Sequence, residues 1–573
     1  MTRPQSAALF LCALLSAADM ALPQALDQPK PLPGARPSPA AVEAWHARKF
    51  GMFIHFGLYS MLGGVWQGKE IANGYSEQIL SHAPVPAAEY SALAKQFNPE
   101  KFDPDAIAKL AQDAGMKFIV ITAKHHDGFN LFHTRLTDYN VVDLSPYHKD
   151  IVRQLADACA RHGLKFGVYY SSIDWHYPGA TPYTSDNNNP IPKTHEDFNV
   201  GQLRELASGY GPLSEIWFDM GRPTPAQSKR FTGTVHALQP DCLVSGRVFN
   251  HEGDFTVMGD NQIPQFVLDE PWQTPASIYP DTWGYRSWAQ RTDLPGKIDE
   301  HILQLAQVVS RGGNYLLNIG PRGDGSVVEF EAAVLRGVGT WLKQNGEAIY
   351  GAGPQPFRSL SFGYATVKPG KLYLLVREWP AGGVLELPGL RNRLKRAYLL
   401  ADPARRALRI ENGATRKAVL QPSVEKPAPL VVVVAEYEGK LNVIPPVAAP
   451  DPNGSLVLLE RDADHFLNYN GYGYYEPPTV YKEQWALAVP RSGRYQVDVF
   501  YENPAGAKKI DLVIGGQRFA VTLPPAAQGK AAAAVATLAA SPYAALKITP
   551  PEPFYKGDKL GVKIDRVELR RVP

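Results

Sequence analysis

The stretch Ser214-Glu215-Ile216-Trp217-Phe218-Asp219-Met220-Gly221 decides the predicted fold. Its apolar run ends in a carboxylate and a glycine follows two residues later, which predicts a buried strand whose last residue emerges into a loop. In a parallel α/β barrel, catalytic groups lie at the carboxyl ends of the strands. An aspartate here has a second interpretation, because it can also cap the next helix or pair with a basic neighbour. Residues elsewhere in the chain distinguish the catalytic interpretation of this aspartate from the structural one.

Strands and helices alternate around this stretch. Residues 50–57, 117–122 and 165–170 are apolar runs that predict strands, and the first of them includes His55. Asp103-Pro104 begins a helix, because aspartate is a favoured N-cap and proline suits the first helical position. The alternation continues to about residue 350 and predicts a parallel sheet wrapped by helices. Its length favours a closed (β/α)8-like TIM barrel, and the absence of a Gly-rich phosphate loop after the first strand disfavours a nucleotide-binding fold.

After Gly351 the pattern changes to short apolar runs between turns, which is typical of all-β structure. The stretch Ala531–Ala540 is Ala-rich and predicts either a helix or a loosely ordered edge. The predicted organisation is a signal peptide (1–21), a Pro-rich linker (22–39), the barrel (40–350), a β-sandwich domain (351–440), a second linker (441–452) and a C-terminal β-sandwich module (453–573).

The N-terminus predicts export. Arg3 precedes an apolar run from Ala7 to Leu15, and small residues follow at 16–18. This is the pattern of a cleaved secretory signal, too short to span a membrane. We therefore expect a secreted protein, periplasmic or extracellular, with a non-cleaved anchor as the alternative.

Composition excludes several classes of function. The formal net charge of +3 over 573 residues and the lack of a basic tract argue against nucleic acid as a partner. No later run is apolar and long enough for a membrane span. Once Cys12 is removed with the signal, only Cys159 and Cys242 remain, too few for a disulfide scaffold or a zinc site. Whether these two cysteines pair stays open.

Histidines gather at the predicted mouth of the barrel. His125 and His126 follow the strand that ends at Thr122, and His55 lies on the first strand. Adjacent histidines do not easily face one metal ion, and no carboxylate triad accompanies them, so we expect no metal and no other cofactor. Imidazoles that hydrogen-bond a polyhydroxylated ligand are the favoured interpretation, and buried histidines bonded to backbone are the alternative.

Longer motifs then point to one family. They are residues 49–60 (KFGMFIHFGLYS), 97–99 (FNP), 122–129 (TAKHHDGF), 167–171 (GVYYS), 216–219 (IWFD), 283–285 (WGY) and 313–321 (GNYLLNIGP). In this order, over about residues 40–350, the chain resembles the retaining α-L-fucosidases of glycoside hydrolase family 29. The resemblance implies a (β/α)8-like barrel followed by a β-sandwich, and hydrolysis of terminal α-L-fucose with retention of configuration.

The same resemblance assigns site residues. Asp219 lies at the position of the family's nucleophile, and a carboxylate there has the chemistry to attack the anomeric carbon through an oxocarbenium-like transition state. The residues implied to line the fucose pocket are His55, Trp66, His125, His126, Tyr170, Arg247 and Trp283.

The general acid/base is the open point. Many family members carry a glutamate directly after a tryptophan, but here Trp272 is followed by Gln273, which cannot donate and recover a proton. The candidates are Glu270 or Asp269 in the same loop, Asp260, and Glu77, with Glu270 slightly favoured. A retaining pair needs its carboxyl groups ~5–5.5 Å apart.

Three classes of function therefore stay in view. The first is a secreted exo-α-L-fucosidase that acts on fucosylated oligosaccharides or glycoconjugates. The second is a fucose-binding relative with impaired or lost turnover, suggested by Gln273, and the third is a metal-dependent hydrolase. The terminal module resembles appended carbohydrate-binding β-sandwiches, and Tyr469, Tyr472, Tyr474 and Tyr475 fit that role or simple packing. Linkage preference and oligomeric state are not readable.

Overall fold

The computed structural model describes residues 36–71, 74–178, 190–268, 270–413, 416–420, 429–444, 447–468, 479–503, 505–551 and 560–573. The predicted signal, most of the linker after it, Asp269 and the four tyrosines of the terminal module lie outside the described residues.

Eight strands form one sheet in the order β7-β6-β5-β4-β1-β10-β9-β8, and every neighbouring pair runs parallel. They are β1 (Phe50–Ile54), β4 (Phe118–Lys124), β5 (Lys165–Ser171), β6 (Leu213–Asp219), β7 (Leu243–Val244), β8 (Thr256–Val257), β9 (Trp272–Ser277) and β10 (Asn314–Ile319). A parallel bridge between Ser245 and Phe255 joins the two outermost strands and closes the ring. The expected (β/α)8-like barrel is confirmed.

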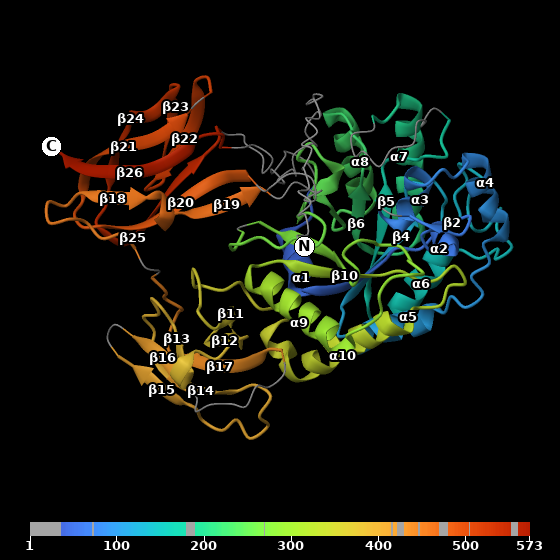
Figure 1. Ribbon diagram of the computed structural model, residues 1–573, viewed down its shortest axis with the longest axis horizontal. Coiled ribbons are helices and arrows are strands. Elements are labelled where there is room, and N and C mark those ends of the chain that lie inside the picture. The colour runs from blue at the N-terminus through green and yellow to red at the C-terminus, as the bar shows by residue number, and fades with distance from the viewer. Residues whose placement is uncertain are drawn as a thin grey trace, which may run out of the picture.

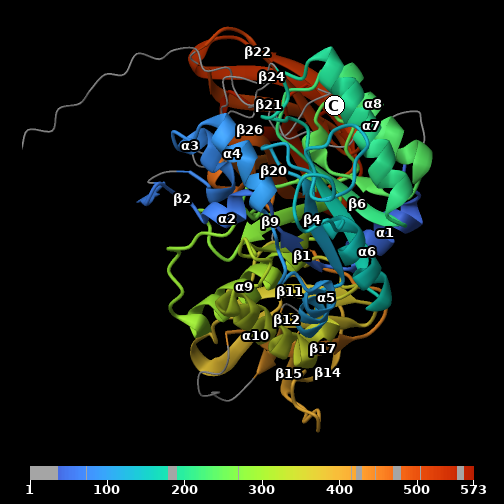
Figure 2. The ribbon, with the colours of Figure 1, turned by 90° about the vertical axis from the view of Figure 1, so that its right-hand side faces the viewer.

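Helices surround this ring of strands (Figure 1 and Figure 2). The long ones are α1 (Pro39–Ala47), α5 (Pro104–Asp113), α6 (Ile151–Arg161), α7 (Lys193–Gly209), α8 (Pro225–Leu238), α9 (Leu294–Ser310) and α10 (Glu329–Asn345), and the short ones are α2 (Tyr59–Leu62), α3 (Ile79–His82) and α4 (Ala87–Ala92). Several begin as their sequences predict. The carboxylate of Asp103 accepts the N–H of Ala106 at the start of α5, and Asp150 does the same for Arg153 at α6.

Alternation along each barrel strand separates two cores. Trp217 packs with Phe53, Val120, Tyr169 and other residues inside the ring. Ile216 and Phe218, its neighbours on β6, belong to the larger core between the strands and the helices. Because side chains on a strand alternate, Asp219 shares the inner face with Trp217 and emerges above it at the end of the barrel.

A second unit of two antiparallel sheets follows the barrel. One sheet has the order β11-β12-β17-β14 and the other β13-β16-β15. Their strands are β11 (Gly363–Lys368), β12 (Lys371–Val376), β13 (Val384–Glu386), β14 (Leu394–Leu399), β15 (Arg409–Asn412), β16 (Lys417–Leu420) and β17 (Val431–Tyr437). The larger sheet packs on α9 and α10 (Figure 1). There the indole N–H of Trp341 donates to the carbonyl of Leu430 over 3.0 Å.

The C-terminal unit is a sandwich of two more antiparallel sheets around its own apolar core. Its strands are β18 (Leu456–Leu459), β19 (Asp464–Asn468), β20 (Thr479–Val489), β21 (Gly493–Asn503), β22 (Lys508–Ile514), β23 (Gln517–Leu523), β24 (Ala526–Leu538), β25 (Ser541–Thr549) and β26 (Lys563–Val572). The rings of Phe266, in a barrel loop, and Phe466 lie 5.2 Å apart, and Arg358 pairs with Asp464 over 2.5 Å.

The helix considered for the Ala-rich stretch is wrong. Residues 531–538 belong to β24, which pairs with β21 at the edge of its sheet. Alanine has the highest helix propensity, but intrinsic propensity is a weak preference, and pairing with β21 outweighs it.

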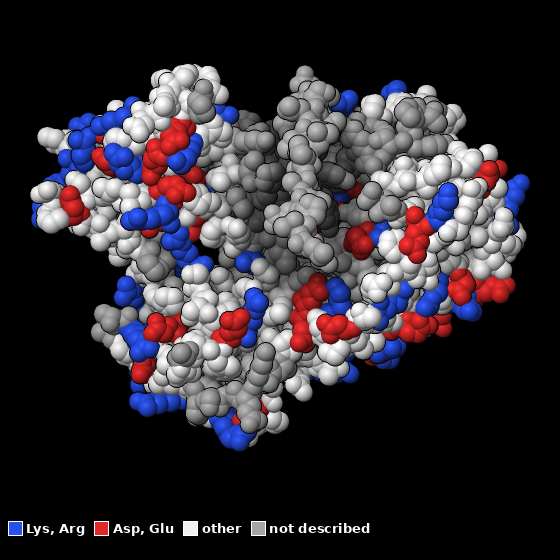
Figure 3. Space-filling model, viewed as in Figure 1, with Lys and Arg blue, Asp and Glu red and all other residues white. Residues whose placement is uncertain are grey.

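The surface and the cysteines add three observations. On the face drawn in Figure 3, Lys and Arg side chains are interspersed with Asp and Glu side chains. No helix in the described part of the chain is both long and apolar enough to cross a membrane. Cys159 and Cys242 are buried free thiols, so they do not pair with each other.

Candidate active site

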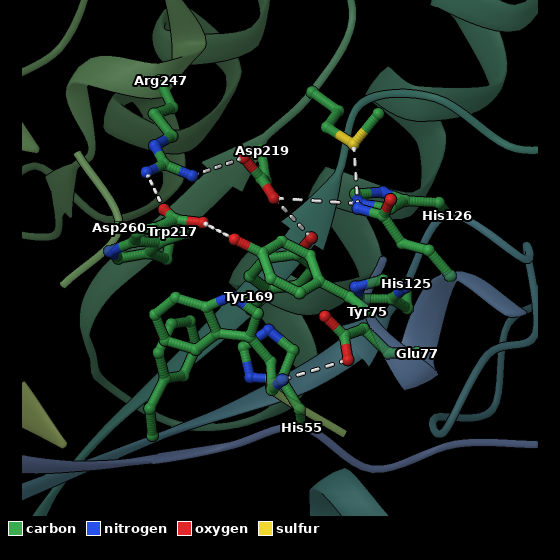
Figure 4. A pocket seen from close by; sticks show the side chains of 14 residues that line it. His55, Tyr75, Glu77, His125, His126, Tyr169, Trp217, Asp219, Arg247 and Asp260 are labelled. Atoms are coloured by element: carbon green, nitrogen blue, oxygen red, sulfur yellow. Dashed lines mark hydrogen bonds and ion pairs between the residues drawn. The ribbon is translucent and has the colours of Figure 1, made fainter. Parts of the chain in front are cut away.

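One pocket opens at the carboxyl ends of the barrel strands (Figure 4). It encompasses about 360 Å³ of empty space, part of which is open to solvent. Its lining combines aromatic, imidazole and carboxylate side chains: Phe53, His55, Tyr75, Glu77, Gln78, His125, His126, Tyr169, Trp217, Asp219, Met220, Arg247, Asp260 and Trp283.

Asp219 is the last residue of β6, as the opening stretch predicted. Met220, the next residue, has φ 55° and Gly221 has φ 88°, so the strand ends abruptly and the carboxylate stays at the rim. The Tyr169 hydroxyl donates to Oδ2 over 2.8 Å, and Nη1 of Arg247 donates to Oδ1 over 3.0 Å. Both carboxylate oxygens are therefore held in place by donors.

Arg247 joins two carboxylates. Its Nη2 donates to Oδ1 of Asp260 over 2.5 Å while Nη1 holds Asp219, so the two aspartates lie on either side of one guanidinium (Figure 4). Arg247 lies in a short 3-10 turn after β7, and Phe249, Asn250 and His251 that follow all have positive φ angles. Such backbone strain is common where a loop is fixed to place a functional side chain.

The two aspartates have opposite pKa shifts. Burial alone would raise the pKa of Asp219, but the charge of Arg247, the neighbouring His126 and the hydrogen bonds donated by Arg247 and Tyr169 outweigh it, and the pKa is lowered. Burial raises the pKa of Asp260, and the nearby Asp219 charge adds to this against the effect of Arg247. The surroundings of Asp219 thus favour its ionised form, whereas those of Asp260 make its carboxyl group easier to protonate than it is in water.

The three histidines of the predicted cluster converge in the pocket. Burial lowers the pKa of His55 to about 3 and that of His126 to about 4, and it also lowers the pKa of His125. All three imidazoles are therefore neutral at ordinary pH. Within the described residues, no three His, Cys, Asp or Glu side chains are arranged to hold a metal ion.

Glu77 positions one wall of the pocket. It lies in the 3-10 turn Ser76–Gln78, and its Oε2 accepts the backbone N–H groups of Gly284 over 2.7 Å and Trp283 over 3.1 Å. Burial raises its pKa to about 7, although these hydrogen bonds favour the carboxylate. The contacts fix the loop that carries the Trp283 ring.

Three expected site residues are described but do not line the pocket. Trp66 lies in the short strand β2 (Val65–Trp66), which pairs with β3 (Lys69–Glu70). Tyr170 points outward from β5, where its hydroxyl contacts Asn199 and Gln202 of α7. Glu270 precedes β9, at the amino end of a barrel strand, whereas the pocket lies at the carboxyl ends.

Several pocket residues were not predicted from the sequence: Phe53, Tyr75, Gln78, Tyr169, Trp217 and Met220. For three of them, the alternation of side chains along a strand would have predicted that they face the pocket. Phe53 lies two residues before His55, and Trp217 lies two residues before Asp219, so each pair shares a face. Tyr169 faces inward for the same reason that its neighbour Tyr170 faces outward.

Gln273 lies beneath the pocket rather than in it. Its amide N–H donates to Oε1 of Glu215 over 3.1 Å, and its Oε1 accepts the indole N–H of Trp217 over 2.9 Å. The second oxygen of Glu215 accepts the indole N–H of Trp45 over 2.5 Å. An amide can donate to a carboxylate and accept from an indole at once. Gln273 therefore supports Trp217, and it has no contact that would suit a proton donor to the substrate.

Replacing Gln273 with glutamate is expected to make stability pH-dependent. A protonated glutamic acid keeps both hydrogen bonds, whereas the ionised form puts two carboxylates in contact in the interior. The folded-state pKa of the new group is thus raised above its unfolded value of about 4.3. Relative to wild type, the variant should be equally stable below about pH 4 and lose about 1.4 kcal/mol per pH unit above it, until the folded-state pKa is reached. Denaturant titrations over this range measure the difference.

Gln96→Glu is the matched control, because Gln96 is exposed and the substitution adds the same charge at the surface. It should show no such pH dependence. Equal slopes in the two variants would mean that net charge, and not contact with Glu215, is responsible.

A closed parallel barrel whose pocket holds two aspartates, neutral imidazoles and aromatic rings has the groups that a glycoside hydrolase needs. Comparison with known proteins makes this specific. The sequence profile described as Alpha-L-fucosidase matches residues 34–347. The human tissue α-L-fucosidase is 32% identical over 376 residues, which cover 62% of this chain and 78% of that protein. The human plasma α-L-fucosidase is 33% identical over 60% of this chain and 78% of that protein.

Solved structures agree. An α-L-fucosidase from Vibrio sp. strain EJY3 superposes with a TM-score of 0.67 at 26% identity, covering 94% of this chain and 99% of that chain. A covalent intermediate of a family 29 α-L-fucosidase from Bacteroides thetaiotaomicron, trapped with a fluorinated fucosyl fluoride, gives 0.64 at 26% identity over 73% of this chain and 100% of that chain. The chain belongs to the α-L-fucosidases of glycoside hydrolase family 29, and its substrates are fucosylated glycans.

Proposed function

We propose that this α-L-fucosidase removes terminal α-L-fucose by a retaining double displacement, with Asp219 as nucleophile and Asp260 as general acid/base. The observation that carries the proposal is the guanidinium of Arg247, which binds both aspartates in one pocket. Because one guanidinium donates to both carboxylates, the two carboxyl groups are neighbours in the pocket, as the ~5–5.5 Å separation of a retaining pair requires.

The pKa shifts support this division of roles. The lowered pKa of Asp219 favours the carboxylate that attacks, and the raised pKa of Asp260 makes it the easier of the two to protonate, as donation to the leaving oxygen requires. Arg247 donates to Oδ1 of Asp260, and the Tyr75 hydroxyl donates to Oδ2 over a longer distance of 3.5 Å.

Esterification would also switch the role of Asp260. The charge on Asp219 is one cause of the raised pKa of Asp260, and that charge disappears when Asp219 bonds to the anomeric carbon. The pKa of Asp260 then falls, so the group that has given its proton to the leaving oxygen becomes a base for the incoming water. The trapped covalent intermediate of the Bacteroides relative is consistent with this order of chemical steps.

The configuration of the first product tests the mechanism. Proton NMR during rapid hydrolysis of an aryl α-L-fucoside should show α-L-fucose first, followed by slow mutarotation to the β anomer. Initial release of the β anomer would contradict a double displacement, and so would a product mixture already at equilibrium when the reaction starts.

The pH profile should be bell-shaped with an acidic optimum. Asp219 must be ionised, and its lowered pKa sets the acid limb; Asp260 must be protonated for the first step, so kcat/KM falls as pH rises through its raised pKa. Measuring kcat/KM between about pH 3 and 9 gives the two apparent pKa values of the coupled pair.

Two variants identify the alkaline limb, because Glu77 also titrates, with a pKa of about 7. In Asp260→Asn the residual activity should no longer fall at high pH. In Glu77→Gln the alkaline limb should remain. The reverse pattern would assign the acid to Glu77 and contradict the proposal.

We also propose that the enzyme is exported. The support is the sequence pattern of residues 1–21, which combines Arg3, the apolar run from Ala7 to Leu15 and small residues after it. N-terminal sequencing of the mature protein from culture fractions tests this, and a mature chain that keeps Met1 in the cytoplasmic fraction would contradict it.

A further inference from the structure

Two of the pocket's imidazoles are held from behind by residues that do not line the pocket. Nδ1 of His55 lies 2.7 Å from Oδ1 of Asn318, on β10. Nδ1 of His126 lies 2.7 Å from Oγ of Ser171, at the end of β5. Asn318 and Ser171 are both buried. In each ring the bond occupies Nδ1, so Nε2 is the atom that remains for a ligand.

The proton on His55 follows from the next bond outward. The Nδ2 of Asn318 donates to the carbonyl of Trp283 over 2.7 Å. A carbonyl only accepts, so the amide nitrogen must face Trp283 and the amide oxygen must face His55. That oxygen also only accepts, so Nδ1 of His55 has to carry the proton.

The same logic applies to His126. Ser171 has one hydroxyl proton, and it donates that proton to the carbonyl of Ile173 over 2.8 Å. Toward His126 the hydroxyl oxygen is therefore an acceptor, and Nδ1 of His126 is the donor. Ser171 fixes the second imidazole as Asn318 fixes the first.

A neutral imidazole with its proton on Nδ1 has a lone pair on Nε2. Burial keeps both rings neutral by lowering the pKa of His55 to about 3 and that of His126 to about 4. Nε2 of His126 lies 3.8 Å from Oδ2 of Asp219. Nε2 of His126 and a carboxylate oxygen of the proposed nucleophile are thus neighbouring acceptors, and a hydroxyl group of the ligand is a donor that suits Nε2.

We propose that Asn318 and Ser171 are positioning residues that hold His55 and His126 as Nδ1–H tautomers, so that the pocket selects its sugar by the hydroxyl protons the sugar donates. The identity of the sugar rests on the α-L-fucosidase activity and on the proposed function. The tautomers themselves are a property of the free enzyme.

¹⁵N NMR of the ligand-free, ¹⁵N-histidine-labelled enzyme tests the tautomers directly. Nδ1 should be protonated and Nε2 unprotonated in both rings between about pH 5 and 8. The signals are assigned by their loss in His55→Gln and His126→Gln. A proton on Nε2 in either ring would overturn the proposal for that ring, whatever the roles of Asp219 and Asp260.

Ser171→Ala and Ser171→Thr provide a matched pair for His126. Without the hydroxyl, the His126 signals should shift toward the other tautomer and KM should rise by roughly tenfold, while the threonine hydroxyl restores both. A rise in KM with unchanged His126 signals would mean that Ser171 only fills space.

Asn318→Asp tests His55 through its charge. A carboxylate next to Nδ1 favours the imidazolium, whose Nε2–H is a donor, so KM should rise as pH falls and recover as pH rises through the new pKa of His55. The other charged or titratable groups that face His55 are His125, His126, Tyr169, Asp219 and Arg247. All of them are unchanged in the variant.

Asn314→Asp is the control for this substitution. Asn314 lies on the same strand, at its other end, and its Nδ2 likewise donates to a backbone carbonyl, that of Trp45, over 2.9 Å. This variant loses the same kind of bond but places its charge at the end of β10 away from His55. An equal, pH-independent change of KM in both variants would overturn the role of Asn318.

Ligand analogues complete the test. Fluorine accepts weakly and cannot donate, so replacing the hydroxyl that meets an Nε2 by fluorine should weaken binding as much as replacing it by hydrogen. If each fluoro analogue bound clearly better than its deoxy counterpart, the rings would be donors and the proposal would fail.

Discussion

Replacing Asp219 with glycine is expected to lower kcat by roughly 10⁴- to 10⁶-fold, the loss that follows removal of a residue from a catalytic triad. The reason is that no other described carboxylate takes its place: Asp260 and Glu77 line the same pocket, but Asp260 is held across Arg247 and Glu77 accepts hydrogen bonds from a backbone loop. Added azide should restore part of the activity and give a fucosyl azide of inverted configuration, because it attacks from the face that the carboxylate occupied.

Trapping the intermediate on the wild-type enzyme is the complementary measurement. A fluorinated fucosyl donor slows both chemical steps, and mass spectrometry of the digest should place the label on the peptide that contains Asp219. The Asp219→Gly variant should take up no label while it keeps the unfolding transition of a folded protein. A label on any other carboxylate, or a rescued azide of retained configuration, would contradict the assignment.

Much of this site could be predicted because its residues follow the ends of strands. Parallel strands of a barrel bring their carboxyl ends to one face, so a strand that ends in Asp219 and another followed by His125 and His126 must meet there. His55 is one residue beyond β1 and joins them. No knowledge of side-chain contacts is needed for this step, since topology alone brings the residues together.

The sequence motifs did not show which aromatic residues face the barrel interior. Tyr169 and Tyr170 are adjacent on β5, and a motif match cannot say which one faces the barrel interior. The structure turns Tyr169 inward, where it bonds Asp219, and Tyr170 outward to α7. Trp217 lies two residues before Asp219, so the alternation of side chains along the strand would have placed it on the inner face too. The prediction relied on the motif match and did not apply this alternation.

Among the acid/base candidates, Glu270 does not line the pocket, and the physical reason is a different one. Placing Glu270 at the pocket assumed that the loop before Trp272 lies at the rim of the barrel. In fact β9 begins at Trp272, so residues just before it lie at the amino end of the strands. Gln273 then points into the barrel interior and bonds Glu215 and Trp217, contacts that depend on residues distant in sequence.

Replacing Asp260 with alanine is expected to give an effect that depends on the leaving group. For a methyl fucoside, whose leaving oxygen needs a proton, kcat/KM should fall by roughly 10²- to 10⁴-fold, the usual contribution of general acid catalysis. For a dinitrophenyl fucoside, which needs little protonation, kcat/KM should change far less. Its kcat and KM should instead fall together, because the second step lacks its base and the covalent intermediate accumulates.

Azide and a matched variant separate this role from simple damage to the pocket. Azide needs no general base, so it should raise kcat of Asp260→Ala on the activated substrate and give a fucosyl azide of retained configuration, opposite to the product expected from Asp219→Gly. Glu77→Gln keeps an oxygen that accepts from Gly284 and Trp283, and its effect should be small and equal for both leaving groups. If Glu77→Gln showed the leaving-group dependence and Asp260→Ala did not, Glu77 would be the acid. The carboxyl held by Arg247 would then serve only to orient the nucleophile.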